Sequence, residues 1–439
     1  MDPPRDASRT SRLRVAFRVE MLVWVVTLGV LTLLLLSFVV PKWRVFTHTP
    51  CTMHNTMRAT QPAVRMAFPA HRALLTASSS GSSVSSASGV DLRSLQRRDH
   101  PLRQRTIFVS VPAYRDPETP HTLVSLLRNA AFPARITIGV CEQAASEDEP
   151  VEAAALRLLR EQAPQHEDTL RRALRMMRIP ASAARGPILA RWLIEQELYR
   201  DEDFLLMVDS HSQFAPAWDS YLLEEHAAAP LQPAVLTTYC NPYERANRAA
   251  ARFYTPAMRL NFRRFEPDSR IPLWDADTLP PQQLRALRHP PFTFGWSGNC
   301  AFMPRAVVRA VPFHDGPTYP FLFFGEEVGM AVRLFTHGVH LFAPRYDAIL
   351  CLYERDYRPL YWNEVPDRKG QEEASRGRMR RMLGMEAPGQ PHGLYGRQAL
   401  GSVRTLEQYK QYSGMDLAAQ RVEEYARTGE PRTAVLGWS

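Results

Sequence analysis

An apolar run ends in a carboxylate and an imidazole at Phe204-Leu-Leu-Met-Val-Asp-Ser-His211. A short apolar run of this kind is typical of a strand that is buried on both faces, as the strands of parallel sheets are. In α/β proteins the ligand-binding residues follow the carboxyl ends of such strands. Asp209 and His211 could hold a divalent cation through one oxygen and one nitrogen atom, and that cation could neutralise a diphosphate. The stretch therefore predicts an α/β fold with a metal site beside Val208, although a carboxylate that only caps the next turn would give the same letters.

The segments around this run alternate between strand-like and helix-like patterns. Residues 106–111 and 135–141 are β-branched apolar runs separated by a helical pattern at 119–131, which predicts a βαβ unit. The other segments predict a solvated helical excursion at 151–178, an amphipathic helix at 186–199, a strand at 234–239, loops to about 291, an apolar block at 292–302 and a helix at 326–337. We therefore expect one α/β domain over 106–362 and a peripheral, partly helical extension over 363–439.

Polar residues also follow the first predicted strand, where a nucleotide docks in nucleotide-binding α/β folds. The candidates there are Pro112, Tyr114, Arg115 and Asp116. Tyr114 could stack on a base, and Asp116 could accept a hydrogen bond from a uracil imide or a ribose hydroxyl. The alternative is a simple turn built on Pro112 and Asp116.

Two arginines precede the 204–208 strand by one predicted helix. The guanidinium groups of Arg185 and Arg191 could bind a diphosphate through paired hydrogen bonds. A surface salt bridge would explain Arg191 equally well.

Two loops of small residues lie beside aromatic residues later in the chain, at 294–299 and 324–327. Small residues allow a backbone to approach a ligand closely. Candidates for an acceptor and sugar pocket in the first loop are Trp296, Ser297, Gly298 and Asn299. Glu326 and Glu327 in the second loop are candidate catalytic residues, and one of them could bind sugar hydroxyls. In the alternative, the aromatics belong to the core and the glutamates begin a helix, where its dipole favours them.

The first 105 residues differ in character from the rest. Residues 21–40 carry no charge and are long enough to span a bilayer, and five arginines precede them. The positive-inside rule then predicts a cytosolic tail at 1–20, a transmembrane signal anchor at 21–40 and a flexible serine-rich stem at 41–105. A cleaved signal peptide and a buried core helix are the alternatives.

The net charge and the cysteines indicate which partners and disulfides to expect. The net charge of +9 is accompanied by no recognisable nucleic-acid module, so we expect no nucleic-acid partner. The five cysteines have no zinc-site spacing. Cys51, directly after the predicted span, is a candidate for a disulfide that links a dimer, and a free thiol is equally compatible. The other four could form two bridges of unknown pairing.

The ordered set of motifs resembles the polypeptide N-acetylglucosaminyltransferases of protists and some bacteria. The resemblance covers about 106–362 and rests on Ile107-Phe-Val-Ser-Val-Pro-Ala-Tyr-Arg-Asp116, Gly139-Val-Cys-Glu-Gln143, Arg185-Gly-Pro187, Ala190-Arg191, Val208-Asp-Ser-His-Ser-Gln-Phe214, Trp218-Asp219, Phe324-Gly-Glu-Glu327 and Tyr353-Glu-Arg355. It implies a GT-A, Rossmann-like fold and a Golgi type II membrane enzyme with a lumenal catalytic domain. The implied reaction moves GlcNAc from UDP-GlcNAc to Thr, Ser or hydroxyproline hydroxyls, with Mn²⁺ or another divalent cation and with retention of configuration.

The resemblance also implies roles for individual residues. Asp209 and His211 would bind the metal, and Glu326 and Glu327 would lie near the donor sugar. Cys351 stands where the family pattern leads us to expect a histidine as third ligand, and a thiolate is a softer ligand for Mn²⁺. Two alternatives remain open: another UDP-sugar donor on the same fold, or an inactive, membrane-tethered glycan-binding protein.

Overall fold

The computed structural model describes residues 90–365, 368–386 and 396–438. The chain divides into two compact units, residues 1–49 and 50–439, and all described residues belong to the second unit. The predicted tail, the predicted membrane span, most of the stem and Cys51 lie outside the described residues. Among the residues that are described, no helix combines the length and apolar character that crossing a membrane requires.

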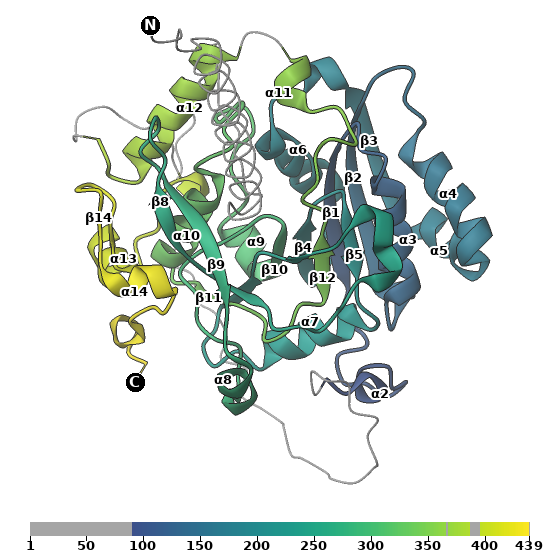
Figure 1. Cartoon of the computed structure of the whole chain (residues 1–439), viewed down its shortest axis with the longest axis horizontal. Coiled ribbons are helices and arrows are strands. Elements are labelled where there is room, and N and C mark those ends of the chain that lie inside the picture. The colour runs from purple at the N-terminus through teal and green to yellow at the C-terminus, as the bar shows by residue number, and fades with distance from the viewer. Residues whose placement is uncertain (1–89, 366–367, 387–395, 439) are drawn as a thin grey trace, which may run out of the picture. The chain divides into compact units, whose positions relative to one another are not determined.

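A seven-stranded sheet forms the centre of this unit, in the strand order β11-β6-β10-β4-β1-β2-β3 (Figure 1). Its strands are β1 (Ile107–Tyr114), β2 (Ile136–Ala144), β3 (Leu174–Pro180), β4 (Phe204–Val208), β6 (Ala234–Thr237), β10 (Cys300–Pro304) and β11 (His340–Phe342). Within this sheet β10 runs antiparallel to both of its neighbours, and the other pairs are parallel. The carboxyl ends of β1 and β4 therefore meet at one edge of the sheet, as the sequence predicts.

The sheet separates two hydrophobic layers because successive side chains of a strand point to opposite faces. In β4, Leu205 and Met207 pack into one cluster, whereas Leu206 and Val208 pack into the other. All four side chains are completely buried. Burying a side chain of this size stabilises the fold by about 1.5–3 kcal/mol, which explains why the 204–208 run has no polar residue.

Helices cover both faces of the sheet (Figure 1). One layer contains α6 (Pro187–Leu193) with its π-helical continuation η4 (Ile194–Leu198), α9 (Arg305–Ala310) and α10 (Glu326–Thr336). The other layer contains α3 (Thr119–Asn129), α4 (Val151–Gln162), α5 (Glu167–Ala173) and α7 (Trp218–Ala227). This arrangement confirms the predicted α/β class.

A second sheet joins segments that are distant in sequence. It has the order β5-β12-β7, from Ser212–Phe214, Ile349–Cys351 and Asn241–Pro242. The antiparallel pairing of β12 with β5 puts Cys351 opposite Ser212, and the Leu352 N–H donates to the His211 carbonyl over 2.9 Å. This pairing brings residue 351 to the end of β4.

Two segments differ from the prediction. Leu174–Pro180, expected within a helical excursion, is the edge strand β3, where charged side chains such as Arg175 are tolerated because the edge is open. The expected loops before residue 291 contain a bulged hairpin of β8 (Met258–Phe265) and β9 (Pro272–Thr278), followed by α8 (Pro281–Ala286). Leu260 and Trp274 of the hairpin are buried in the core.

The C-terminal extension, predicted as peripheral, also contributes to the core. It contains α12 (Lys369–Met382), α13 (Leu406–Ser413), β13 (Met415–Asp416), β14 (Arg421–Val422) and α14 (Glu424–Thr428). Met379, Tyr409 and Tyr412 are buried in the same cluster as α10. Because α12 has many charged residues, its sequence pattern does not reveal the few positions that are buried.

The last part of the predicted stem is packed as well. Helix α2 (Leu92–Leu95) buries Leu95, and the ring of His100 lies 2.8 Å from the Glu224 carboxylate of α7. The four described cysteines are buried and free, so the two disulfides considered from the sequence are not formed.

Candidate active site

Asp209, His211 and Cys351 bring an oxygen, a nitrogen and a sulfur atom together beyond the end of β4. His211 Nε2 and Cys351 Sγ lie 3.8 and 3.7 Å from Asp209 Oδ2, and the three ligand atoms all lie within 4.8 Å of one another. Asp209 and His211 follow β4 directly, whereas Cys351 arrives through the β5–β12 pairing. The structure thus gathers the three residues that the sequence proposed as metal ligands.

Asp116 orients the ring of His211. The Asp116 Oδ2 atom lies 2.8 Å from His211 Nδ1, so we assign the ring proton to Nδ1, which leaves Nε2 unprotonated. Burial opposes ionisation of Asp116, but His211, Arg358 and Ser210 hold the pKa of its carboxyl below the ordinary value. The structure thus shows a contact of Asp116 with His211, and its contact with a base or ribose stays a prediction.

The donor set fits a divalent cation. Ligands bound to one ion at about 2.0–2.6 Å lie roughly 3–4 Å apart, and Asp209 Oδ2 lies 3.8 and 3.7 Å from the other two atoms. Carboxylate oxygen and imidazole suit Mn²⁺, whereas a thiolate favours a softer ion such as Zn²⁺ or Co²⁺. Burial raises the pKa of the Cys351 thiol well above its ordinary value, so the thiol would have to lose its proton on binding. Cys351 is therefore the weakest part of the fit to Mn²⁺.

Arg191 links the metal-ligand group to helix α10. Its Nη2 donates to Asp209 Oδ1 over 2.9 Å and to the Gly298 carbonyl over 3.0 Å, and its Nη1 donates to Glu326 Oε1 over 2.7 Å. The side chain is buried between these two carboxylates. Arg191 thus belongs to an internal ion-pair network that holds Asp209 in place, and its contact with a diphosphate stays a prediction.

Glu326 and Glu327 begin α10 but point to different partners, as a helix N-terminus requires of adjacent residues. Glu326 is buried against Arg191, whereas Glu327 is partly exposed and accepts a hydrogen bond from the Tyr239 hydroxyl over 2.7 Å. Burial raises the pKa of Glu327 to about 7. Glu327 is therefore the acid of this pair that remains available to a ligand.

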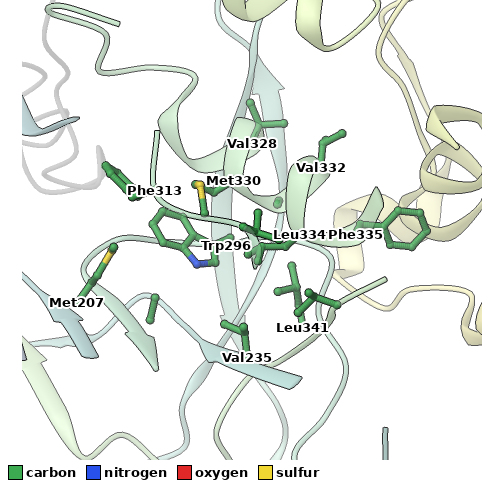
Figure 2. Packing of buried hydrophobic residues seen from close by; sticks show 14 of the residues in the cluster. Met207, Val235, Trp296, Phe313, Val328, Met330, Val332, Leu334, Phe335 and Leu341 are labelled. Atoms are coloured by element: carbon green, nitrogen blue, oxygen red, sulfur yellow. The ribbon is translucent and has the colours of Figure 1, made fainter. Parts of the chain in front are cut away.

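The loop predicted as an acceptor and sugar pocket belongs to the interior. Trp296 is completely buried and packs among Met207, Met330 and Phe313, as Figure 2 shows. A side chain at Gly298 would come within 2.9 Å of Arg191 and of Glu326. Ser297 and Asn299 are buried, and Asn299 donates to the Tyr353 hydroxyl over 3.1 Å. This loop supports the Arg191 network, and its residues are buried; their role in an acceptor and sugar pocket stays a prediction.

The polar residues after β1 are engaged with other parts of the protein. The Tyr114 hydroxyl donates to Glu364 over 2.8 Å, and its ring packs against Tyr361. Arg115 donates to Asp148 and to Glu364, at 2.8 and 2.9 Å. These partners leave Tyr114 buried, so it offers no open face for the predicted stacking on a base.

Two further residues predicted to bind the nucleotide, Pro112 and Arg185, contact other parts of the protein. Pro112 is part of strand β1, where it pairs with Cys141. Arg185 donates to the carbonyls of Ser182 and Ala184 in its own loop, and its guanidinium lies over the Phe321 ring. Neither residue has a contact that tests its predicted role.

Three residues to which the sequence analysis gave no role also surround the group. Arg355 Nη1 lies 2.9 Å from His211 Nε2, the Tyr357 hydroxyl donates to Asp116 over 3.1 Å, and Arg358 Nε lies 3.4 Å from the same carboxylate. Arg355 belongs to the motif Tyr353-Glu-Arg355, whereas the signal for Tyr357 and Arg358 is their position within seven residues of the third candidate ligand.

Comparison with known proteins gives one family. The family model for Glycosyltransferase (GlcNAc) matches residues 106–168 and 156–419, well over half of the chain. No curated protein matches the chain in sequence.

Among solved structures, S. aureus TarS 1-349 in complex with UDP-GlcNAc is 11% identical, with a TM-score of 0.35, over 57% of this chain and 59% of the 1-349 chain. The mannosyltransferase PcManGT from Pyrobaculum calidifontis, in complex with GDP-Man and Mn²⁺, is 14% identical, with a TM-score of 0.34, over 64% of this chain and 61% of its own. The chain spans about three-fifths of the length of each.

Proposed function

Since the chain belongs to the GlcNAc glycosyltransferase family, we propose that it transfers GlcNAc from UDP-GlcNAc to Thr, Ser or hydroxyproline hydroxyls of polypeptides in a metal-dependent reaction. The convergence of Asp209, His211 and Cys351 at the carboxyl end of β4 carries this proposal. A divalent cation bound there would supply positive charge for the departing UDP. The motifs shared with the polypeptide-acting enzymes support the choice of acceptor.

The surrounding residues prepare this site for the donor. Arg191 fixes Asp209 and Asp116 fixes His211, so two ligands are held before anything binds. Such preorganisation avoids the cost of rearrangement during the reaction. Glu327 keeps its proton up to about pH 7 and could therefore hydrogen-bond a sugar hydroxyl as a donor or as an acceptor.

The proposal needs no general base from the protein. In transfer with retention, the acceptor hydroxyl attacks from the face that the phosphate leaves, and the phosphate oxygen can take its proton. We further propose a type II Golgi enzyme, anchored by residues 21–40, with the domain over 106–362 and its C-terminal extension in the lumen. The uncharged run and the arginines before it support this topology.

The test uses the full-length chain in detergent with UDP-GlcNAc, Mn²⁺ and a threonine-rich peptide. We expect UDP release and an α-linked GlcNAc on the peptide, with the anomer identified by NMR. Asp209→Ala should abolish both. The matched control is Asp203→Ala, at the opposite end of the same strand, which loses contacts to Thr106 and Arg105 but none to the metal-ligand group.

Three other results would change the proposal. Preferential use of UDP-GalNAc or UDP-galactose would replace the donor. A β-linked product would contradict retention. Glycan binding by the folded protein without release of UDP from any donor would favour the glycan-binding alternative.

A further inference from the structure

Arg355 occupies the position at which His211 would meet a cation. Its Nη1 lies 2.9 Å from His211 Nε2, which is the ring nitrogen left free by the contact of Nδ1 with Asp116. A guanidinium can only donate hydrogen bonds, so this contact uses the Nε2 lone pair. One lone pair cannot serve a guanidinium and a metal ion at the same time.

The guanidinium also supplies the charge that a cation would bring. Its Nη1 lies 2.9 Å from His211 Nε2, which itself lies 3.8 Å from Asp209 Oδ2. Arg355 is half-buried rather than enclosed, and its remaining hydrogen bonds go to the carbonyls of Leu352 and Glu354 beside it. It can therefore leave His211 by a movement of its own segment, without opening the core.

This segment also covers the end of β1. We call residues 355–364 the strap; it includes α11 (Tyr361–Glu364), which lies near the end of β1 in Figure 1. Tyr357 contacts Asp116, Glu364 accepts hydrogen bonds from Tyr114 and Arg115, and Arg358 Nη1 lies 3.4 Å from the Tyr114 carbonyl. The strap thus reaches from the metal-ligand group to the residues that the sequence predicts for the nucleotide.

We propose that Arg355 and a divalent cation compete for His211, so that binding of the cation displaces Arg355 and loosens the strap over the end of β1. The inference rests on the metal-dependent donor site proposed above. It assigns Arg355 a positioning role: in the free protein it contacts the ring nitrogen of His211, and its release frees that nitrogen for the cation.

The first test measures the affinity of the full-length chain for Mn²⁺, and for Co²⁺ because of the thiol, by titration calorimetry without donor or acceptor. Arg355→Ala should bind the ion about tenfold more tightly, because a charge-assisted hydrogen bond of roughly 1.4 kcal/mol no longer has to break. Most substitutions beside a ligand weaken binding, so the direction itself is diagnostic. An affinity that is unchanged or weaker in Arg355→Ala would overturn the proposal, as would a failure of both proteins to bind either ion.

A matched variant separates competition from simple charge. Arg358→Gln removes a positive charge from the same strap but leaves the Nε2 contact of His211 intact. Removing such a charge should change the affinity by less than about threefold. Equal tightening in Arg358→Gln and Arg355→Ala would overturn direct competition. Thermal melting of each variant confirms that the fold is retained.

The second test follows the strap itself by hydrogen–deuterium exchange. Adding Mn²⁺ to the wild type should speed the exchange of residues 355–364, whereas Arg355→Ala should exchange quickly with and without the ion. Slower exchange of the strap in the wild type on adding Mn²⁺ would contradict its release. Because no donor or turnover enters either test, a protein that behaves as expected but transfers no sugar would contradict the proposed function alone.

Discussion

The carboxyl ends of β4 and β1 have the same sequence signal and different outcomes. Each is an apolar strand followed by charged residues at the same edge of the sheet. At the end of β4, the ligand atoms of Asp209, His211 and Cys351 lie within 4.8 Å of one another. At β1, Tyr114 and Arg115 are bound to Glu364 and Asp148. The two strand ends thus differ in what distant segments bring to them: β12 brings the thiol of Cys351 to the end of β4, whereas α11 brings the carboxylate of Glu364 to the end of β1.

The largest expected effect tests the β4 end directly. Asp209→Asn should reduce sugar transfer at least about 1,000-fold, because the loss of a charged ligand removes several kcal/mol of metal-based stabilisation. Arg115→Gln at the β1 end should change transfer by less than about threefold, since its partners are protein carboxylates rather than ligands. Initial rates and Mn²⁺ titrations of both variants provide the measurement. Comparable losses in the two variants would remove the distinction between the strand ends.

The next largest effect is expected at Asp116, which follows β1 and contacts His211 at the end of β4. Asp116→Asn should weaken Mn²⁺ binding about 10–100-fold, as loss of a carboxylate that orients a ligating histidine typically does. Tyr357→Phe is the control, because it removes another partner of Asp116 and leaves the contact with His211. If Asp116→Asn instead raised the KM for UDP-GlcNAc with unchanged metal affinity, the originally predicted nucleotide contact would be restored.

The next effect is a pH-dependent change in folding stability that comes from Glu327. Its folded pKa is raised to about 7 from an ordinary value of 4.5. The unfolded chain therefore loses this proton near pH 4.5 while the folded protein keeps it, so stability should fall as pH rises from about 4.5 through 7. Glu327→Gln should lose less stability over this range. Urea midpoints at pH 5 and pH 8, in metal-free protein, measure the difference; parallel changes in both proteins would exclude Glu327 as the source.

The smallest expected effect lies at the β1 end. Tyr114→Phe removes one hydrogen bond to Glu364 and should destabilise the fold by about 1 kcal/mol or less, since Arg115 still pairs with this carboxylate. The KM for UDP-GlcNAc should stay within about twofold, because the hydroxyl contacts protein and not donor. Denaturation curves and donor kinetics separate the two effects. A tenfold increase in KM would mean that the β1 end binds the nucleotide through this hydroxyl.

The sequence predicts the structural features that depend on residues close together in the chain. The run at 204–208, the first βαβ unit and helix α10 follow from local apolar patterns, and Asp209 and His211 follow from their place after β4. Strand β3 was missed because its arginines break the apolar pattern, and the buried stripe of α12 was missed for the same reason.

The sequence does not predict contacts between residues that are distant in the chain. Arg191 binds a glutamate 135 positions away, and Tyr114 binds one 250 positions away. Neither contact can be predicted from the local sequence around Arg191 or Tyr114. Trp296 shows the same limit, because nothing in its local sequence distinguishes a buried aromatic from one that lines a pocket.

The pairing of β5 with β12 has a consequence for biosynthesis. The third candidate ligand is 142 positions after the first, so a ribosome has made most of the domain before the site can exist. A nascent chain that ends before β12 carries an aspartate and a histidine without the thiol, and it lacks the central strand of the small sheet. An ion bound across this pairing would favour the completed protein over all shorter intermediates.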